Sequence, residues 1–137
     1  MREYTYDELA IGQEESFSIQ VTEEMMGSFR DITGDLNPLH VDEQFAKNRG
    51  FPNRVAYGML TASFLSTLAG MYLPGKNSLI YSVSIEFPKP VFIGDILEIS
   101  GTIAEKDDRF HMITVKITIH NQDKKVCRGN MKIGVMQ

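Results

Sequence analysis

The residues best suited to chemistry in this sequence lie between positions 35 and 40. Asp35, Asn37 and His40 place a carboxylate, an amide and an imidazole around Pro38. A carboxylate and an imidazole that hold the same water molecule can act together as general acid and base. The Asn37-Pro38 pair disfavours helix at Asn37 and predicts a rigid turn, which can aim side chains into a cleft. A structural interpretation competes: Asp35 caps a helix or turn, Asn37 makes a local hydrogen bond and His40 fills a gap. Spacing alone favours the structural interpretation.

Other groups of reactive residues are weaker candidates. His40, His111 and His120 lie far apart in the sequence, and the single cysteine, Cys127, has no partner at the spacing of metal ligands. No metal site and no cofactor are therefore expected. Cys127 stands at the head of an apolar strand pattern, which favours a small core residue over a nucleophile.

The first half of the sequence predicts the elements that would position residues 35–40. Alternating polar and apolar residues at 15–21 predict a first strand. Thr22, followed by two glutamates, caps a predicted helix that ends at Gly34. A second short helix is predicted from Asp42 to Gly50, with a loop over residues 51–57.

Residues 58–73 are apolar on nearly every side, so they predict a long helix that other elements enclose. This helix is too short for a comfortable membrane span. Strands are predicted at 78–87, 96–106, 110–121 and 126–135. The order of elements indicates an α+β fold in which a curved, mainly antiparallel sheet wraps around one long buried helix. An open sheet edge of this kind also favours pairing with a second copy.

Composition sets the broad class of protein. The chain has 137 residues, of which 42% are hydrophobic and 23% charged, which predicts one domain over residues 1–137. A net charge of −4 and the lack of a basic patch make nucleic acid a poor candidate partner. One cysteine and an N-terminal stretch without an apolar run are typical of a cytoplasmic protein without a leader or membrane anchor.

Several motifs together resemble the MaoC-like, R-specific enoyl-CoA hydratase family. They are the residues of positions 34–42, the run Tyr57-Gly58-Met59-Leu60, the run at 73–75 and the stretch 87–95. The combination of Asp, Asn-Pro and His is the most specific of these. The resemblance implies a hot-dog fold, usually as a homodimer, which agrees with the independent prediction. The family often has His where this chain has Tyr57, which affects the pocket lining and acyl preference.

The resemblance also implies an activity and site residues. The activity is reversible hydration of trans-2-enoyl thioesters to R-3-hydroxyacyl thioesters, with an acyl-CoA or acyl-carrier-protein thioester as substrate. Asp35 and His40 correspond to the catalytic pair, and the N–H of Gly58 to the donor for the thioester oxygen. Asn37 corresponds to an amide that orients the pair or its water, and Ser66 to a polar group near the substrate. Glycine at a helix start suits this task, since its unpaired N–H lies at the positive end of the helix dipole.

Two other functions remain open from the sequence. One is a hot-dog acyl-CoA thioesterase, although many such enzymes carry Asp or Glu on the long helix and residues 58–73 contain neither. The other is a non-catalytic module that binds acyl thioesters, since a fold alone does not establish chemistry. The sequence leaves open the acyl chain length, the carrier, the physiological direction and which member of the pair is acid or base.

Overall fold

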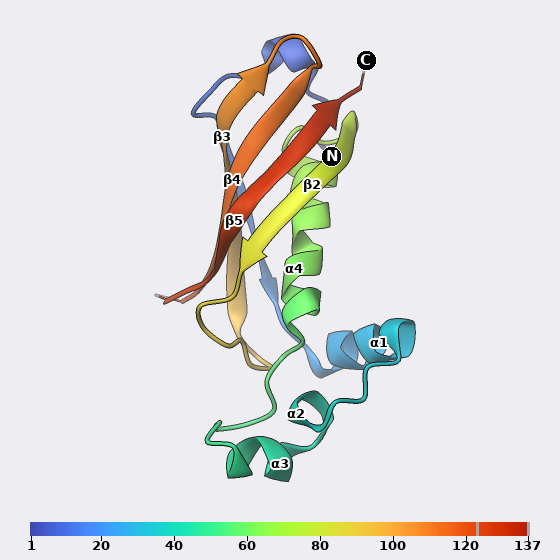
Figure 1. Cartoon of the computed structure of the whole chain (residues 1–137), viewed down its shortest axis with the longest axis vertical. Coiled ribbons are helices and arrows are strands. Elements are labelled where there is room, and N and C mark those ends of the chain that lie inside the picture. The colour runs from blue at the N-terminus through green and yellow to red at the C-terminus, as the bar shows by residue number, and fades with distance from the viewer. Residues whose placement is uncertain (123, 137) are drawn as a thin grey trace.

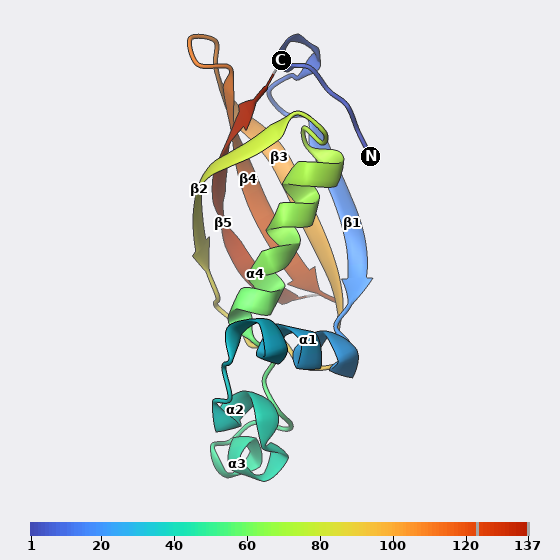
Figure 2. The same ribbon diagram turned by 90° about the vertical axis from the view of Figure 1, so that its right-hand side faces the viewer.

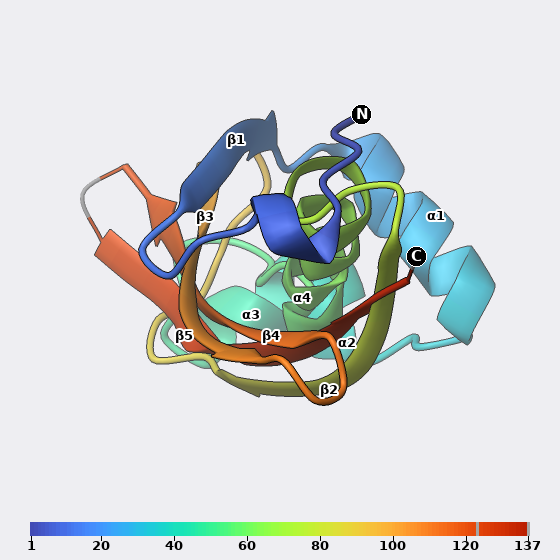
Figure 3. The same ribbon diagram turned by 90° about the horizontal axis from the view of Figure 1, so that it is seen from above.

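The structure, a computed structural model, describes residues 1–122 and 124–136. Its centre is a five-stranded sheet in the order β1-β3-β4-β5-β2, in which every neighbouring pair is antiparallel. The strands are β1 (Glu14–Gln20), β2 (Ser78–Glu86), β3 (Ile96–Asp107), β4 (Met112–Asn121) and β5 (Lys124–Val135). Helix α4 (Gly58–Thr67) runs along the concave side of this curved sheet (Figures 1 and 3). The predicted α+β hot-dog fold is thus confirmed.

The core lies between the concave face of the sheet and α4. Alternation along β4 places Ile113, Val115 and Ile117 on this face, where each is fully buried. Burial of such a side chain contributes about 1.5–3 kcal/mol relative to its exposure. Gly101 on β3 allows a close approach, because a Cβ there would stand 2.9 Å from Cδ2 of Leu68. The sheet therefore packs directly on the residues that continue the helix beyond Thr67.

Three further helices lie beyond the N-terminal end of α4 (Figure 2). They are α1 (Glu23–Thr33), α2 (Pro38–Val41) and α3 (Glu43–Asn48), and a 3₁₀ turn, η1 (Tyr6–Glu8), precedes β1. The predicted caps of α1 are confirmed, since the Thr22 side chain accepts from the Met25 N–H and Gly34 adopts a left-handed φ of 71°. The rigid turn predicted around Pro38 is partly a helix, because proline is well suited to the first position of α2.

Two other predicted elements are present and differ from the prediction only in detail. The long helix predicted over residues 58–73 ends as α4 at Thr67 and continues as a π-helical turn, η2 (Leu68–Tyr72). The strand predicted from Phe110 begins at Met112, because His111 has a φ of 50° in the preceding turn and its ring stacks on that of Tyr6 at 4.5 Å.

The apolar sequence of α4 predicts that other elements enclose the helix on every side, but the structure leaves one side open. Met59, Ser63 and Ser66 are exposed, and they follow one another at helical spacing. The reason is that the sheet covers one side of the helix and leaves the opposite side open (Figure 2). Within the described residues, no helix has the length and apolar character needed to cross a membrane.

Candidate active site

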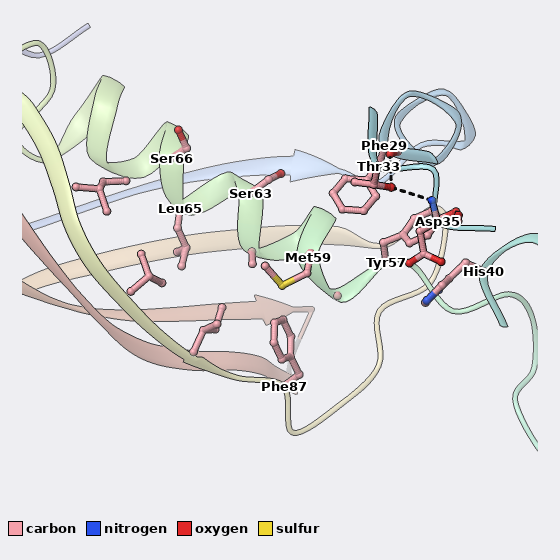
Figure 4. A pocket seen from close by; sticks show the side chains of 15 residues that line it. Phe29, Thr33, Asp35, His40, Tyr57, Met59, Ser63, Leu65, Ser66 and Phe87 are labelled. Carbon is pink, nitrogen blue, oxygen red and sulfur yellow. Dashed lines mark hydrogen bonds between the residues drawn. The ribbon is translucent and has the colours of Figure 1, made fainter. Parts of the chain in front are cut away.

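A cavity of about 820 Å³ opens beside the N-terminal half of α4. The segment after α1, the start of α4 and strand β2 form its walls (Figure 4). A register shift between Ile80 and Ser82 lets Ile80, Val83 and Ile85 all line this cavity from β2. The cavity wall consists of Phe29, Thr33, Asp35, His40, Tyr57, Gly58, Met59, Ala62, Ser63, Leu65, Ser66, Ile80, Val83, Ile85 and Phe87.

Asp35 lies just beyond the C-terminal end of α1. The left-handed Gly34 turns the chain there, and the Asp35 N–H donates to Oγ1 of Thr33 at 3.2 Å. The Asp35 carboxylate accepts a hydrogen bond from the N–H of Asn37 at 3.0 Å. This bond fixes Oδ1 of Asp35 to the backbone of residue 37. The Asp35 side chain is exposed and lines the cavity.

His40 reaches the same cavity from the short helix α2. Its Nδ1 lies 2.7 Å from the carbonyl oxygen of Val55. A carbonyl oxygen only accepts, so Nδ1 carries the proton and Nε2 of the neutral ring keeps a free lone pair. Arg54 supports this segment by donating to the His40 carbonyl at 3.4 Å and pairing with Glu23 of α1.

Tyr57 joins these two residues. Its hydroxyl donates to the Asp35 carbonyl oxygen at 2.6 Å, and its ring centroid lies 4.3 Å from that of His40 and 4.8 Å from that of Phe29. The side chain is only 2% exposed. Burial, with a further contribution from the Asp35 charge, raises the pKa of Tyr57 above its ordinary value. The hydroxyl therefore remains a neutral donor at neutral pH.

Gly58 begins α4 beside these residues. The preceding Tyr57 makes no side-chain hydrogen bond to the helix end, so no side chain at the N-cap position satisfies the first N–H groups. Gly58 is exposed, and the nearest atom to a Cβ placed there would be on the Phe87 ring at 3.5 Å. A helix end of this kind stabilises an oxygen that carries negative charge.

The structure brings together three of the five residues predicted for the site. Asp35 and His40 lie at one end of the cavity (Figure 4), and Gly58 lines the same cavity. Ser66 lines the same cavity but lies eight residues beyond Gly58, which is about 12 Å along the helix. Asn37 does not line the cavity: its side chain accepts from the Leu39 N–H and caps α2. This local hydrogen bond matches the structural interpretation of Asn37, while its N–H holds the Asp35 carboxylate.

Sequence reasoning missed two features of the site. The sequence identifies Tyr57 only as a difference from the family's usual histidine in the pocket lining. Its hydroxyl in fact donates a hydrogen bond to the Asp35 carbonyl. The second feature is Thr61, a buried polar residue of α4 that follows Gly58 by three residues. Its place in an otherwise apolar run was the available signal.

Groups that bind metals are not gathered near this cavity. Across residues 1–122 and 124–136, no three His, Cys, Asp or Glu side chains come close enough to hold an ion. Cys127 lies in the core, and burial raises the pKa of its thiol to about 11. A thiol with so high a pKa is mostly protonated and a poor nucleophile at neutral pH.

The chain is similar to known proteins over most of its length. The family described as "MaoC like domain" matches residues 8–125. An (R)-specific enoyl-CoA hydratase of Rhodospirillum rubrum is 30% identical over 130 residues, which cover 95% of this chain and 90% of that protein. The (R)-specific enoyl-CoA hydratase of Aeromonas caviae is 35% identical over 111 residues, which cover 80% and 83% of the two chains.

A solved structure shows the same arrangement of elements. It is the unliganded R-hydratase of Pseudomonas aeruginosa, which is 28% identical with a TM-score of 0.91 over 97% of this chain and 86% of that one. The resemblance inferred from the Asp, Asn-Pro and His motif is therefore confirmed. The chain belongs to the MaoC-like family of proteins.

Proposed function

We propose that this protein catalyses reversible hydration of trans-2-enoyl thioesters to R-3-hydroxyacyl thioesters. The observation that supports this most is that Asp35, His40 and the start of α4 at Gly58 line one cavity. Hydration of an enoyl thioester needs a group that activates water, a group that protonates carbon and a donor for the thioester oxygen. These three residues offer all three functions, and the hydratase relatives support the same chemistry.

The proposed mechanism assigns the proton transfers to His40. The Asp35 carboxylate accepts one hydrogen of a water molecule and orients it, while Nε2 of His40 takes the other as a proton. The hydroxide formed adds to C3 of the substrate. The imidazolium then returns its proton to C2, so that one water is added across the double bond. Such general acid–base catalysis contributes about 10²–10⁴-fold.

Gly58 stabilises the charge that this addition creates. As hydroxide bonds to C3, negative charge moves to the thioester oxygen as an enolate. The N–H of Gly58 donates to that oxygen at the positive end of the α4 dipole. Loss of one donor of this type typically costs about 2.7–4 kcal/mol of transition-state stabilisation.

The cavity beside α4 fits the acyl part of the substrate. Away from Asp35 its wall includes Leu65, Ile80, Val83 and Ile85, which suit an apolar chain. The carrier is coenzyme A or an acyl carrier protein. We further propose that residues 1–137 act as one domain and that the protein works in the cytoplasm, where a lone buried cysteine stays reduced.

We also propose a homodimer that forms through β2. This strand is at the edge of the sheet, and Leu79, Tyr81 and Val83 are 62%, 75% and 46% exposed. Proline and charged side chains on an edge strand hinder pairing with another chain, and residues 78–85 contain neither. The opposite edge strand, β1, by contrast begins with Glu14 and Glu15. A second copy paired along β2 would also cover the open side of α4.

The proposed activity is tested with crotonyl-CoA, by following loss of the enoyl absorbance and release of free thiol together. We expect hydration by the native protein, with the R-enantiomer as product. Asp35→Asn and His40→Gln should each lower kcat by about 10²–10⁴-fold without a change in thermal unfolding. Asp31→Asn is the matched control, because Asp31 is an exposed carboxylate on α1 outside the cavity.

Each alternative gives a different result in this assay. Thiol release without hydration would indicate a thioesterase. Binding of crotonyl-CoA without either reaction would indicate a non-catalytic module. Hydration that persists at the native rate in both Asp35→Asn and His40→Gln would remove the pair from the mechanism.

A further inference from the structure

Few side chains in the cavity beside α4 can carry a proton. Among the described residues that line it, the titratable side chains are those of Asp35, His40 and Tyr57. The Tyr57 hydroxyl donates a hydrogen bond to the Asp35 carbonyl oxygen at 2.6 Å, and burial raises its pKa. Asp35 and His40 are therefore the groups that can exchange a proton with a bound acyl group.

These two groups reach the cavity from one end. Figure 4 shows Asp35 and His40 together at this end, with Leu65 and Ser66 towards the other. The side chains that strand β2 contributes to the wall are apolar, namely Ile80, Val83 and Ile85. A proton therefore approaches a bound substrate from one side only, as far as the described residues are concerned.

His40 is better suited than Asp35 to remove a proton from carbon. Imidazole is a stronger base than carboxylate. The contact of Nδ1 with the Val55 carbonyl oxygen at 2.7 Å leaves the lone pair of Nε2 free to accept. The His40 side chain is half-buried, so its ring can also exchange a proton with water.

The proposed hydration ends when the His40 imidazolium protonates C2 of an enolate. Each step of a reversible reaction also runs backwards through the same groups. The neutral imidazole can therefore remove a C2 proton from a thioester whose carbonyl oxygen accepts from the Gly58 N–H, at the positive end of the α4 dipole. This step needs neither a double bond nor an added water, so a saturated acyl thioester meets its requirements.

We propose that the same cavity exchanges a C2 hydrogen of saturated acyl thioesters with solvent, with His40 as the base. The C2–H bond breaks, the proton moves to Nε2, and the electron pair of the bond moves to the thioester oxygen as an enolate. The imidazolium exchanges its proton with water, and a solvent hydron returns to C2. The thioester is unchanged apart from the isotope. This inference rests on the hydratase function proposed above.

The arrangement of the cavity limits this exchange to one of the two C2 hydrogens. With its carbonyl at Gly58 and its chain against β2, a thioester presents one face of C2 to His40. No titratable side chain of the described residues reaches the cavity from β2 to serve the other face. We therefore expect a singly labelled product in heavy water.

The test uses butyryl-CoA in heavy water, followed by mass spectrometry and by the proton NMR signal of C2. The native protein should introduce one deuterium atom at a rate above that of buffer alone. The equilibrium mixture of crotonyl-CoA and its hydrate should inhibit this exchange competitively. The inhibition constant should equal the apparent affinity of the same mixture in the hydration assay, which places both reactions in one site without the use of a variant.

Two variants separate the base from the group that orients water. His40→Gln should lower both exchange and hydration by about 10²–10⁴-fold. Asp35→Asn should lower hydration to a similar extent but keep exchange within about fivefold of the native rate, since no water is added and exposed charges attract only weakly. Asp31→Asn is again the control and should leave both rates unchanged, because Asp31 lies outside the cavity. A merely structural role of Asp35 would lower both rates together.

The possible results distinguish this inference from the proposed function. Hydration of crotonyl-CoA without exchange in butyryl-CoA would overturn the inference alone. Exchange without hydration would support the inference and overturn the hydratase function, whereas the absence of both would overturn both. Exchange at the native rate in His40→Gln, equal losses of exchange in the two variants, or labelling of both C2 hydrogens at equal rates would also overturn the inference.

Discussion

The hydroxyl of Tyr57 donates a 2.6 Å hydrogen bond to the carbonyl oxygen of Asp35 and so ties the start of α4 to the segment after α1. The ring of the same tyrosine packs on His40 with a centroid distance of 4.3 Å. Tyr57 also directly precedes Gly58. One buried side chain therefore sets the relative positions of the three groups to which the proposed mechanism assigns roles.

Tyr57→Phe tests this positioning role. The variant keeps the packing of the ring on His40 and loses only the bond to the Asp35 carbonyl, which is worth about 1 kcal/mol. We expect kcat for crotonyl-CoA to fall about fivefold with KM nearly constant, as measured by steady-state kinetics. Tyr4→Phe is the control, since the Tyr4 hydroxyl donates to Glu15 outside the cavity. A change confined to KM would contradict a role in alignment.

The β2 edge makes a prediction about assembly. Light scattering coupled to size exclusion should give twice the 15.5 kDa mass of one chain. Tyr81→Lys places a charge on the exposed edge and should shift the protein towards the monomer, because a buried unpaired charge is costly. Phe110→Lys introduces the same charge at a side chain that is 64% exposed in a turn, and should leave the mass unchanged. A monomeric native protein would exclude the proposed dimer.

The pairing of β2 with β5 predicts a difference between two glycines. A Cβ at Gly129 would lie 1.9 Å from the carbonyl oxygen of Ser84, whereas one at Gly134 would come no closer than 3.6 Å to its nearest neighbour, the carbonyl oxygen of Leu79. Gly129→Ala should therefore lower the free energy of unfolding by about 1–3 kcal/mol in urea titrations. Gly134→Ala should change it by less than about 0.5 kcal/mol. Equal effects would contradict the close approach of the two strands.

Cys127 predicts a slow reaction with thiol reagents. Burial raises its pKa from 9.0 to about 11, and only the thiolate reacts. At pH 8, below both values, a difference of two units leaves about a hundredfold less thiolate than in an ordinary cysteine. Reaction with Ellman's reagent should thus be at least about a hundredfold slower in the native protein than in guanidinium. Fast labelling of the native state would show that the thiol is accessible.

Local sequence signals predicted much of this fold. Thr22 and Gly34 marked both ends of α1, because helix caps depend on the residue type at one position. Alternation of residues such as Ile113 and Val115 identified the strands, since it reflects the two faces of a sheet. Helix α2 escaped prediction because its four residues are too few to show a helical period.

The parts of the site that were missed depend on contacts between distant segments. The bond from Tyr57 to Asp35 joins residues 22 positions apart, and the contact of His40 with Val55 spans 15. No local pattern encodes either distance. The open side of α4 was also unpredictable, because it follows from how far the sheet curves around the helix and not from the apolar sequence of the helix itself.

The two ends of the cavity beside α4 are built by different stretches of the chain. The reacting end comes from the segment before α4 and its first residue, and the far end from β2 side chains such as Ile80 and Val83. Chain-length preference and chemical competence are consequently separable properties of this scaffold. Bulkier or smaller residues at positions 80 and 83 offer a route to retune which acyl groups are accepted while the water-activating machinery is left intact.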